Sequence, residues 1–425
     1  MIADAWGVEH NATEEQVVAW NGVVHAVTTH RSDTAAQLDG LLQAKPDFAS
    51  AVALKGLAIM FKGRRDLLPI VDAQLAYAGE CTPYESALFS VLRAWRDDRY
   101  DETEQALSTL VTLAPRNLLA VKLQHGFLFL AGRSPAMLQA IEHAAIQWSE
   151  RDAGYGYVLG CQSFAVGEHG DFDRAEAIGR RAVELAPDDA WGIHAVSHVH
   201  EMRDENGRGA LWLTEHEDGY RDCNNFRGHV FWHLALFELA LRNLDRVYAL
   251  CDDEVRRAWT GDYRDMSNVA SLLWRLEVDG YDVGDRWEEL GAIAADHQTD
   301  HGSAFADVHY ALALVRSGRS ADELLRTICP DGCQGQAAVV AGPGRRLCAA
   351  VAAQGRGEFA RACALFEEVR EELGTIGGSN AQRDLFEQLH IEAALATGDV
   401  TMTRRLIKRR LSQRPENPWT LDRAV

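Results

Sequence analysis

The chain has 425 residues, of which 47% are hydrophobic and 25% charged, and its formal net charge is −20 at pH 7. These fractions are typical of a globular protein and exclude general disorder. So large an acidic excess repels nucleic acid phosphates and anionic lipid, so we expect no nucleic acid partner and no membrane partner.

The beginning of the chain and the cysteines bear on the compartment. Residues 1–11 lack the basic and apolar regions of a signal peptide. No segment approaches the roughly twenty apolar residues that a membrane span needs. The eight cysteines form no C-x-x-C pair and no regular framework. We therefore expect a cytoplasmic protein with free thiols.

From Thr13 onward, Ala- and Leu-rich segments alternate with breaks at Gly, Pro and Asp, and strand-like alternation is scarce. This pattern predicts an all-α fold. The breaks A-K-P-D-F at 44–48, A-P-R-N at 114–117, A-P-D-D at 186–189 and R-P-E-N at 414–417 are similar to one another. The first three are separated by about twice the 34-residue period of tetratricopeptide repeats.

Short glycine-containing motifs lie where the turns of helical hairpins are expected, at 170–175, 355–362 and 398–400. Together with the breaks, they predict an α-solenoid of tetratricopeptide-like helical hairpins, which we expect to close around a central cavity. We assign residues 1–425 to one repeat domain with irregular insertions near 260–301 and 329–344. The second insertion is Gly-rich and reads as a long loop.

Four sequence blocks form a pattern that is typical of a known family. They are H-A-V-S-H-V-H-E-M at 194–202, C-N at 223–224 followed by H-x-x-W-H-L-A-L at 229–236, A-D-V-H-Y-A-L-A-L at 306–314, and G-G-S-N-A-Q-R-D-L-F-E-Q at 377–388. With these blocks, the chain resembles the tetratricopeptide repeat protein 38 family over essentially its full length. The resemblance implies a helical fold and no particular activity. Asn380 departs from the family pattern, in which we expect a histidine.

The stretch from Trp191 to His233 contains the strongest candidate site. His194 and His198 are four residues apart, as are His229 and His233, so each pair lies on one face of a helix. If the two rows face each other, they can bind a divalent metal such as zinc, with Glu201 as a ligand or as the partner of a ligand. The glutamate that follows the first histidine of zincin motifs is absent.

A cysteine nucleophile is our leading hypothesis. Cys223 lies just before a predicted helix, whose dipole would lower the thiol pKa. His198 or His229 could take its proton, Asp307 or Glu201 could orient that histidine, and Asn224 could stabilise an oxyanion. Such a site would hydrolyse or transfer an acyl group of a small-molecule amide or ester, with no cofactor.

Three further residues are candidates for substrate binding: Trp232, His309 and Arg383. A metal-free acid–base site made of histidines and carboxylates is a third hypothesis. For each of these histidines taken alone, the simplest interpretation is a core residue without a catalytic or metal-binding function. The alternative function is a non-catalytic repeat scaffold that binds a peptide or protein. A homodimer is expected only because homodimers are common.

Overall fold

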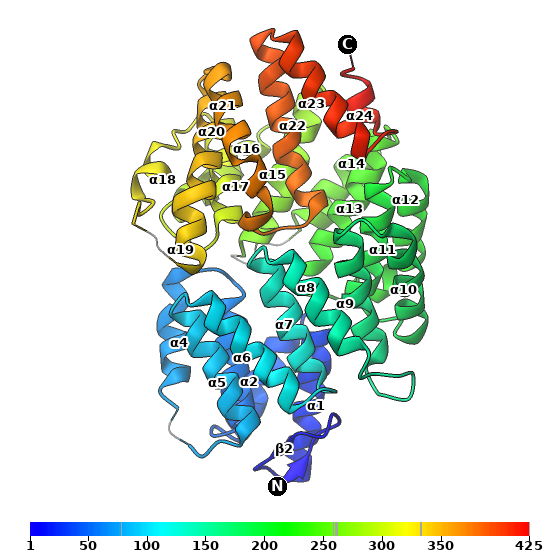
Figure 1. The fold of residues 1–425 in the computed structure, drawn as a ribbon, viewed down its shortest axis with the longest axis vertical. Helices are drawn as coiled ribbons and strands as arrows, with labels where there is room; N and C mark the ends of the chain where they lie inside the picture. Colours follow the sequence, from blue (N-terminus) through cyan, green and yellow to red (C-terminus); the bar gives the residue numbers. More distant parts are fainter. Residues whose placement is uncertain (78, 258, 260–261, 332–333, 425) are drawn as a thin grey trace. The chain divides into compact units, whose positions relative to one another are not determined.

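The computed structural model describes residues 1–425 except 78, 258, 260–261, 332–333 and 425 (Figure 1). Helices make up most of this chain, so the all-α prediction is confirmed. The described residues form two compact units. Unit 1 comprises Met1–Val196 and Glu215–Arg227, and unit 2 comprises Ser197–Thr214 and Gly228–Val425.

A short antiparallel hairpin of β1 (Ile2–Ala3) and β2 (Glu9–His10) precedes the helices. The helices up to the histidine-rich region are α1 (Glu14–Thr28), α2 (Thr34–Ala44), α3 (Ala49–Met60), η1 (Arg65–Leu67), α4 (Leu68–Leu75), α5 (Pro83–Arg96), α6 (Tyr100–Leu113), α7 (Leu118–Leu130), α8 (Ser134–Ala145), α9 (Tyr155–Glu168), α10 (Phe172–Leu185) and α11 (Ala190–Met202).

The later helices are α12 (Asn206–Glu215), η2 (Glu217–Gly219), α13 (Phe226–Ala240), α14 (Leu244–Leu250), η3 (Cys251–Val255), α15 (Tyr263–Val278), α16 (Arg286–His297), α17 (Ala304–Arg316), α18 (Asp322–Thr327), α19 (Gly335–Val339), η4 (Val340–Gly344), α20 (Arg345–Gly355), α21 (Phe359–Val369), η5 (Arg370–Ile376), α22 (Asn380–Thr397), α23 (Val400–Gln413) and α24 (Pro418–Leu421).

The predicted proline breaks coincide with helix ends. Helices α2, α6, α10 and α23 each end two residues before a proline, at Pro46, Pro115, Pro187 and Pro415 respectively. Proline has no N–H to donate and restricts the residue before it, so a helix does not continue through these positions.

The predicted turns coincide with the connections inside helical hairpins. Gly170 lies between α9 and α10, and Gly357 lies between α20 and α21. Their φ angles are 86° and 74°, which only glycine adopts without steric cost. In both cases the two helices pack against each other. The prediction of tandem helical hairpins is therefore confirmed.

Small residues bring the helices of unit 1 close together. In α10, the buried residues Ala175, Gly179 and Ala182 lie on one face. A Cβ atom at Gly179 would lie 2.5 Å from Val196 Cγ2 and 2.6 Å from Ser163 Oγ. Any larger side chain at this position would force the neighbouring helices apart.

Both stretches that we predicted as irregular insertions contain helices, with residues 260–261 and 332–333 outside the described part of the chain. In 262–301, α15 begins where Asp262 accepts a hydrogen bond from the Arg264 backbone N–H, and α16 follows. That these stretches interrupt the repeat stays a prediction. In the stretch 329–344, α19 and η4 cover 335–344, so the expected long loop is wrong there. Gly344 packs so closely on α17 that a Cβ atom would lie 2.8 Å from Ala304 Cβ. Gly344 therefore allows close packing of two helices and does not mark a loop.

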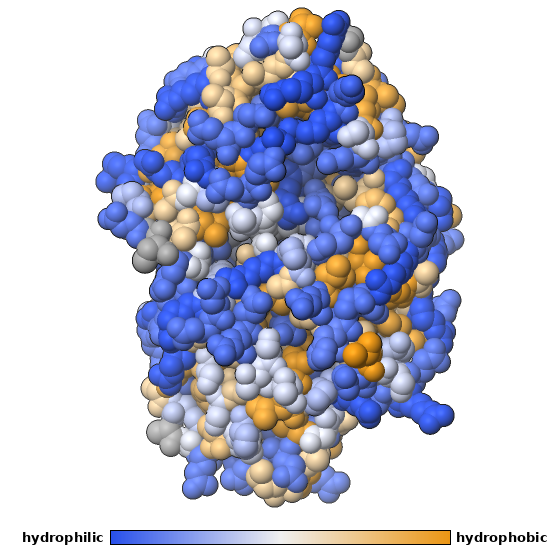
Figure 2. Space-filling view, viewed as in Figure 1, coloured by the Kyte–Doolittle hydropathy of each residue, from blue (hydrophilic) through white to orange (hydrophobic). Residues whose placement is uncertain are grey.

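On the face shown in Figure 2, hydrophilic residues predominate and hydrophobic ones form small separate patches. Within the described part of the chain, no helix combines the length and the apolarity that crossing a membrane requires. The seven cysteines that the structure describes are free thiols, as expected. The single repeat domain and the central cavity stay predictions.

Candidate metal centre

Three helices contribute to a polar site within unit 2. The last two turns of α11 carry His198 and Glu201, and α13 carries His229 and His233. The ligand nitrogens of His198, His229 and His233 all lie within 4.8 Å of one another. The ring centroids of His198 and His233 are 4.5 Å apart, and those of His229 and His233 are 4.8 Å apart. The predicted convergence of these imidazoles is present.

His194, the remaining predicted ligand, precedes His198 by one turn on the same face of α11. It is buried, as are His198 and His233, whereas His229 keeps partial exposure.

Side-chain oxygens orient two of the imidazoles. His233 Nδ1 donates to Glu201 Oε2 at 2.6 Å, and His229 Nδ1 donates to Asn268 Oδ1, on α15, at 2.9 Å. With the proton held on Nδ1, each ring carries its lone pair on Nε2. Metal-binding histidines usually donate their other ring N–H to such an oxygen, which fixes the tautomer and the ring orientation. Glu201 thus occupies the position of a ligand's partner.

Burial sets the charge of these groups. It lowers the pKa of His229 and of His233 well below the ordinary value, and the neighbouring histidines lower it further. Both imidazoles are therefore neutral near pH 7, which is the form that binds a metal. Burial also raises the pKa of Glu201, although the Arg414 and Arg275 guanidinium groups and His198 oppose this.

Trp232 forms an apolar wall beside the cluster. Its ring stacks on His229 with centroids 5.2 Å apart and an interplanar angle of 16°, and it meets His233 edge-on at 4.7 Å. Trp232 is buried. Its contacts are with the imidazoles themselves, so it supports the ligands, and its predicted role in substrate binding stays a prediction.

Cys223 differs from our expectation. It lies in unit 1, where its Sγ donates to the Thr29 carbonyl at 3.3 Å. Burial raises the pKa of this thiol to about 12, and the carboxylates of Asp189 and Asp222 raise it further. The predicted lowering of the pKa by the helix dipole is therefore wrong, because desolvation outweighs the dipole. A buried protonated thiol is a poor nucleophile.

Asn224, another predicted member of that site, helps to start α13. Its Oδ1 accepts a hydrogen bond from the Phe226 backbone N–H at 2.9 Å. The side-chain carbonyl therefore serves the helix terminus. Its predicted contribution to an oxyanion hole stays a prediction.

Asp307 and His309 lie on α17 in unit 2. His301 Nδ1 donates to Asp307 Oδ2 at 3.1 Å, so Asp307 orients this histidine. His309 Nδ1 donates to the Phe305 carbonyl at 2.7 Å, and burial lowers its pKa to about 4. The structure thus gives Asp307 a histidine partner, but a different one from the predicted His198 or His229.

Arg383 is engaged by the start of its own helix. Its guanidinium donates to the Gly378 carbonyl and, at 2.7 Å, to Asn380 Oδ1. The nearby Ser379 forms the capping box of α22 with Gln382. These contacts give Arg383 a role at the start of α22, and its predicted role in substrate binding stays a prediction.

Sequence reasoning missed the contribution of α15. Asn268, Ser271 and Arg275 are buried polar residues spaced three and four apart, so they lie on one face of this helix. Arg275 Nη1 donates to the Ser271 carbonyl at 3.1 Å and to its hydroxyl group. The signal in the sequence is this polar stripe within an otherwise apolar helix.

The chain was compared with known protein families and with solved structures. No model of a known protein family matches the chain. Among solved structures, yeast Tom70 is similar, with a TM-score of 0.37 and 12% identity over 96% of this chain and 86% of that one. The Naa15/Naa10 complex bound to HypK-THB gives a TM-score of 0.26 and 12% identity over 96% of this chain and 64% of that one. The finer resemblance to the tetratricopeptide repeat protein 38 family stays a prediction.

Proposed function

We propose that this helical-repeat protein binds a divalent transition metal ion through His198, His229 and His233 and uses it to hydrolyse an amide or ester of a small molecule. The observation that carries the proposal is the pair of hydrogen bonds from Nδ1 of His233 and His229 to Glu201 and Asn268. A set of three imidazole ligands would favour zinc and would leave one position open for water.

The chemistry follows from the donor set. His198, His229 and His233 would hold the zinc ion, and the chemistry that it would supply is a bound water with a pKa of about 7, which is a nucleophile near neutral pH. The residues of this chain would position that chemistry. Glu201 keeps the His233 ring in its orientation, and Trp232 excludes water from one side of the cluster.

The first experiment is elemental analysis of the full-length protein, purified without chelators. We expect a stoichiometric transition metal in the wild type and its loss from the His198→Ala and His229→Ala variants, with an unchanged far-UV circular dichroism spectrum. A wild type that takes up no zinc or cobalt even when the ion is added would contradict the proposal. Unfolding of both variants would support a purely structural role for these histidines.

A substitution of His194 distinguishes a catalytic metal site from a structural one. A structural zinc site is closed by four protein ligands, whereas a catalytic site keeps a position for water. We expect His194→Ala to retain the metal and His233→Ala to lose it. Loss of the metal from both variants would favour a closed, structural site.

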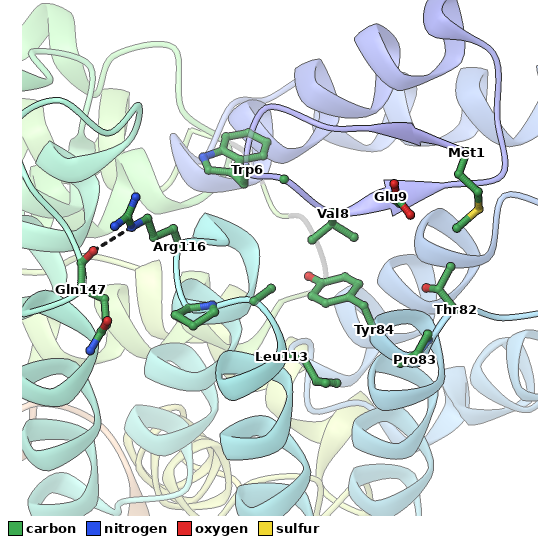
Figure 3. A pocket seen from close by; sticks show the side chains of 13 residues that line it. Met1, Trp6, Val8, Glu9, Thr82, Pro83, Tyr84, Leu113, Arg116 and Gln147 are labelled. Atoms are coloured by element: carbon green, nitrogen blue, oxygen red, sulfur yellow. Dashed lines mark hydrogen bonds between the residues drawn. The ribbon is translucent and has the colours of Figure 1, made fainter.

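A peptide-binding scaffold is the second candidate function. It is favoured by the tandem hairpins and by a pocket of about 700 Å³ in unit 1 (Figure 3). The pocket is lined by the apolar side chains of Trp6, Tyr84 and Leu113 and by Arg116, whose Nε donates to the Gln147 carbonyl at 2.9 Å. A scaffold would bind its peptide equally well without metal, and Leu113→Glu would abolish that binding.

A further inference from the structure

Arg275 has an unused hydrogen-bond donor in the interior of unit 2. Its side chain is 5% exposed, and Nη1 is held by Ser271. Nη2 has no hydrogen-bond partner among the described residues. The Asp384 carboxylate oxygen Oδ2 lies 4.0 Å from it, which is too far for a hydrogen bond.

Asp384 cannot easily move to meet this donor, because other side chains already hold it. Its Oδ2 accepts hydrogen bonds from Arg410 Nη2 at 2.6 Å, from Arg414 Nη1 at 3.3 Å and from Gln388 Nε2 at 2.9 Å. A buried guanidinium nitrogen without an acceptor is costly, so an additional acceptor at this place would be stabilising.

Arg275 is close to the histidine cluster. Its charge influences the pKa of His233, of Glu201 and of His309. It also reaches back to Ser271, three residues after Asn268, which orients His229. Three residues correspond to roughly 4.5 Å of helix rise. A small molecule of a few carbon atoms could therefore contact both Arg275 and an ion held by the histidines.

The buried charges around Arg275 and the histidine cluster favour the binding of an anion. Arg275, Arg410 and Arg414 face the buried carboxyl groups of Glu201, Asp204 and Asp384, and Arg410 and Arg414 also face the partly buried Glu387. A divalent ion bound by the histidines would add two positive charges to this set. Uncompensated buried charge is strongly unfavourable, so an anionic ligand would be stabilised.

We propose that Arg275 binds a carboxylate group of the substrate, and that the substrate class is therefore a small amide or ester bearing a free carboxylate. This inference rests on the proposed metal site. The planar guanidinium suits a carboxylate, because its parallel N–H groups match the two oxygens. The scissile group of the substrate then lies at the histidines.

The test compares two probes of equal length on the full-length protein loaded with cobalt(II). Succinate and butyrate both have four carbons, but only succinate can place one carboxylate on the metal and another on Arg275. Their affinities are read from the visible absorption bands of the cobalt. We expect succinate to bind at least about tenfold more tightly than butyrate in the wild type.

Three variants complete the experiment. The preference for succinate should disappear in Arg275→Gln, persist partly in Arg275→Lys, and persist fully in Arg326→Gln, whose exposed guanidinium pairs with Glu323. If Arg275→Gln does not fold, Arg275→Lys carries the test, because it keeps the charge and loses the planar fork.

The failures are distinguishable. If no cobalt bands appear in the wild type, both the metal site and the role of Arg275 are wrong. If the bands appear but succinate and butyrate bind equally well, the metal site stands and the role of Arg275 is wrong. If inorganic phosphate binds more tightly than succinate and this preference depends on Arg275, the carboxylate assignment is overturned.

Discussion

Nδ1 of His233 donates a hydrogen bond of 2.6 Å to Oε2 of Glu201, and both side chains are buried. Glu201 lies seven residues after His194 and three after His198, and the two partners come from α11 and α13. This one contact fixes the tautomer of a histidine between two others. It is therefore where a single substitution reports most clearly on the proposed metal site.

Glu201→Gln should weaken metal binding without removing it. The amide keeps the shape of the carboxyl group but is a weaker acceptor, and loss of such an orienting partner typically costs about 10–100-fold in metal affinity. Competition titration of zinc against a chromophoric chelator measures the change. The matched control is Glu205→Gln, because Glu205 makes the same kind of contact with His200 Nδ1, at 2.7 Å, outside the cluster. Equal losses in both variants would contradict the assignment.

His229→Ala should abolish stoichiometric metal binding, because it removes one of the three proposed ligands. His309→Ala is the control, since this buried histidine donates to the Phe305 carbonyl and lies on α17. We expect the control to be less stable than the wild type and still to hold its metal. Cobalt(II) absorption spectra of the two variants decide between these outcomes.

The Cys223 thiol should resist labelling in the native protein. Burial raises its pKa to about 12, so very little thiolate exists at pH 8. Mass spectrometry after brief treatment with iodoacetamide would locate the modified cysteines. Cys329 is exposed and serves as an internal control that should react quickly. Rapid modification of Cys223 below neutral pH would instead restore the hypothesis of a cysteine nucleophile.

A feature of the candidate site could be predicted from the sequence only where residues close together in the chain determine it. The histidine rows follow from the helical period alone, so their placement on α11 and α13 could be predicted from four-residue spacing. Asn268 and Arg275 could not be assigned, because no local pattern tells which helix will lie beside another. The direction of the pKa shift of Cys223 was mispredicted for the same reason, since this pKa depends on burial by distant residues.

In the fold, too, features set by local sequence were predicted, and features set by distant contacts were not. Breaks such as Ala186-Pro187 and turns such as Gly170 are dictated by the backbone chemistry of one or two residues, and they were predicted correctly. The Gly-rich stretch near Gly344 was misread as a loop, because its glycine is required by contact with Ala304, some forty residues away in the sequence. Tertiary packing here overrides a local signal.

Asp189 should make unit 1 less stable as the pH rises from about 4 to 6. Its carboxyl group is buried, with Lys122 Nζ 3.7 Å away, and burial raises its pKa from 3.8 to about 6. In this range the folded state keeps a proton that the unfolded state has lost, so the free energy of unfolding falls as pH rises. The slope from this one group is at most about 1.4 kcal/mol per pH unit.

Urea denaturation at several pH values tests this, with Asp189→Asn as the variant. The amide cannot titrate, so the downward contribution between pH 4 and 6 should be absent from its profile. Asp152→Asn is the control, because hydrogen bonds from Ser149 lower the pKa of the partly exposed Asp152. Parallel profiles for the wild type and Asp189→Asn would show that Asp189 does not titrate as described.

Arg414→Ala should strongly destabilise unit 2. The Arg414 side chain is buried and donates to Asp204 Oδ1 and to the Glu201 carbonyl, at 2.6 and 2.7 Å. Truncation leaves buried carboxylates without their partner, which typically costs about 3–5 kcal/mol. The control is Arg326→Ala, whose exposed ion pair with Glu323 should be worth less than about 1 kcal/mol. Urea midpoints followed by circular dichroism give both values. Because Arg414 also holds the backbone of Glu201, its loss should weaken metal binding too, and a variant as stable as Arg326→Ala would contradict this account.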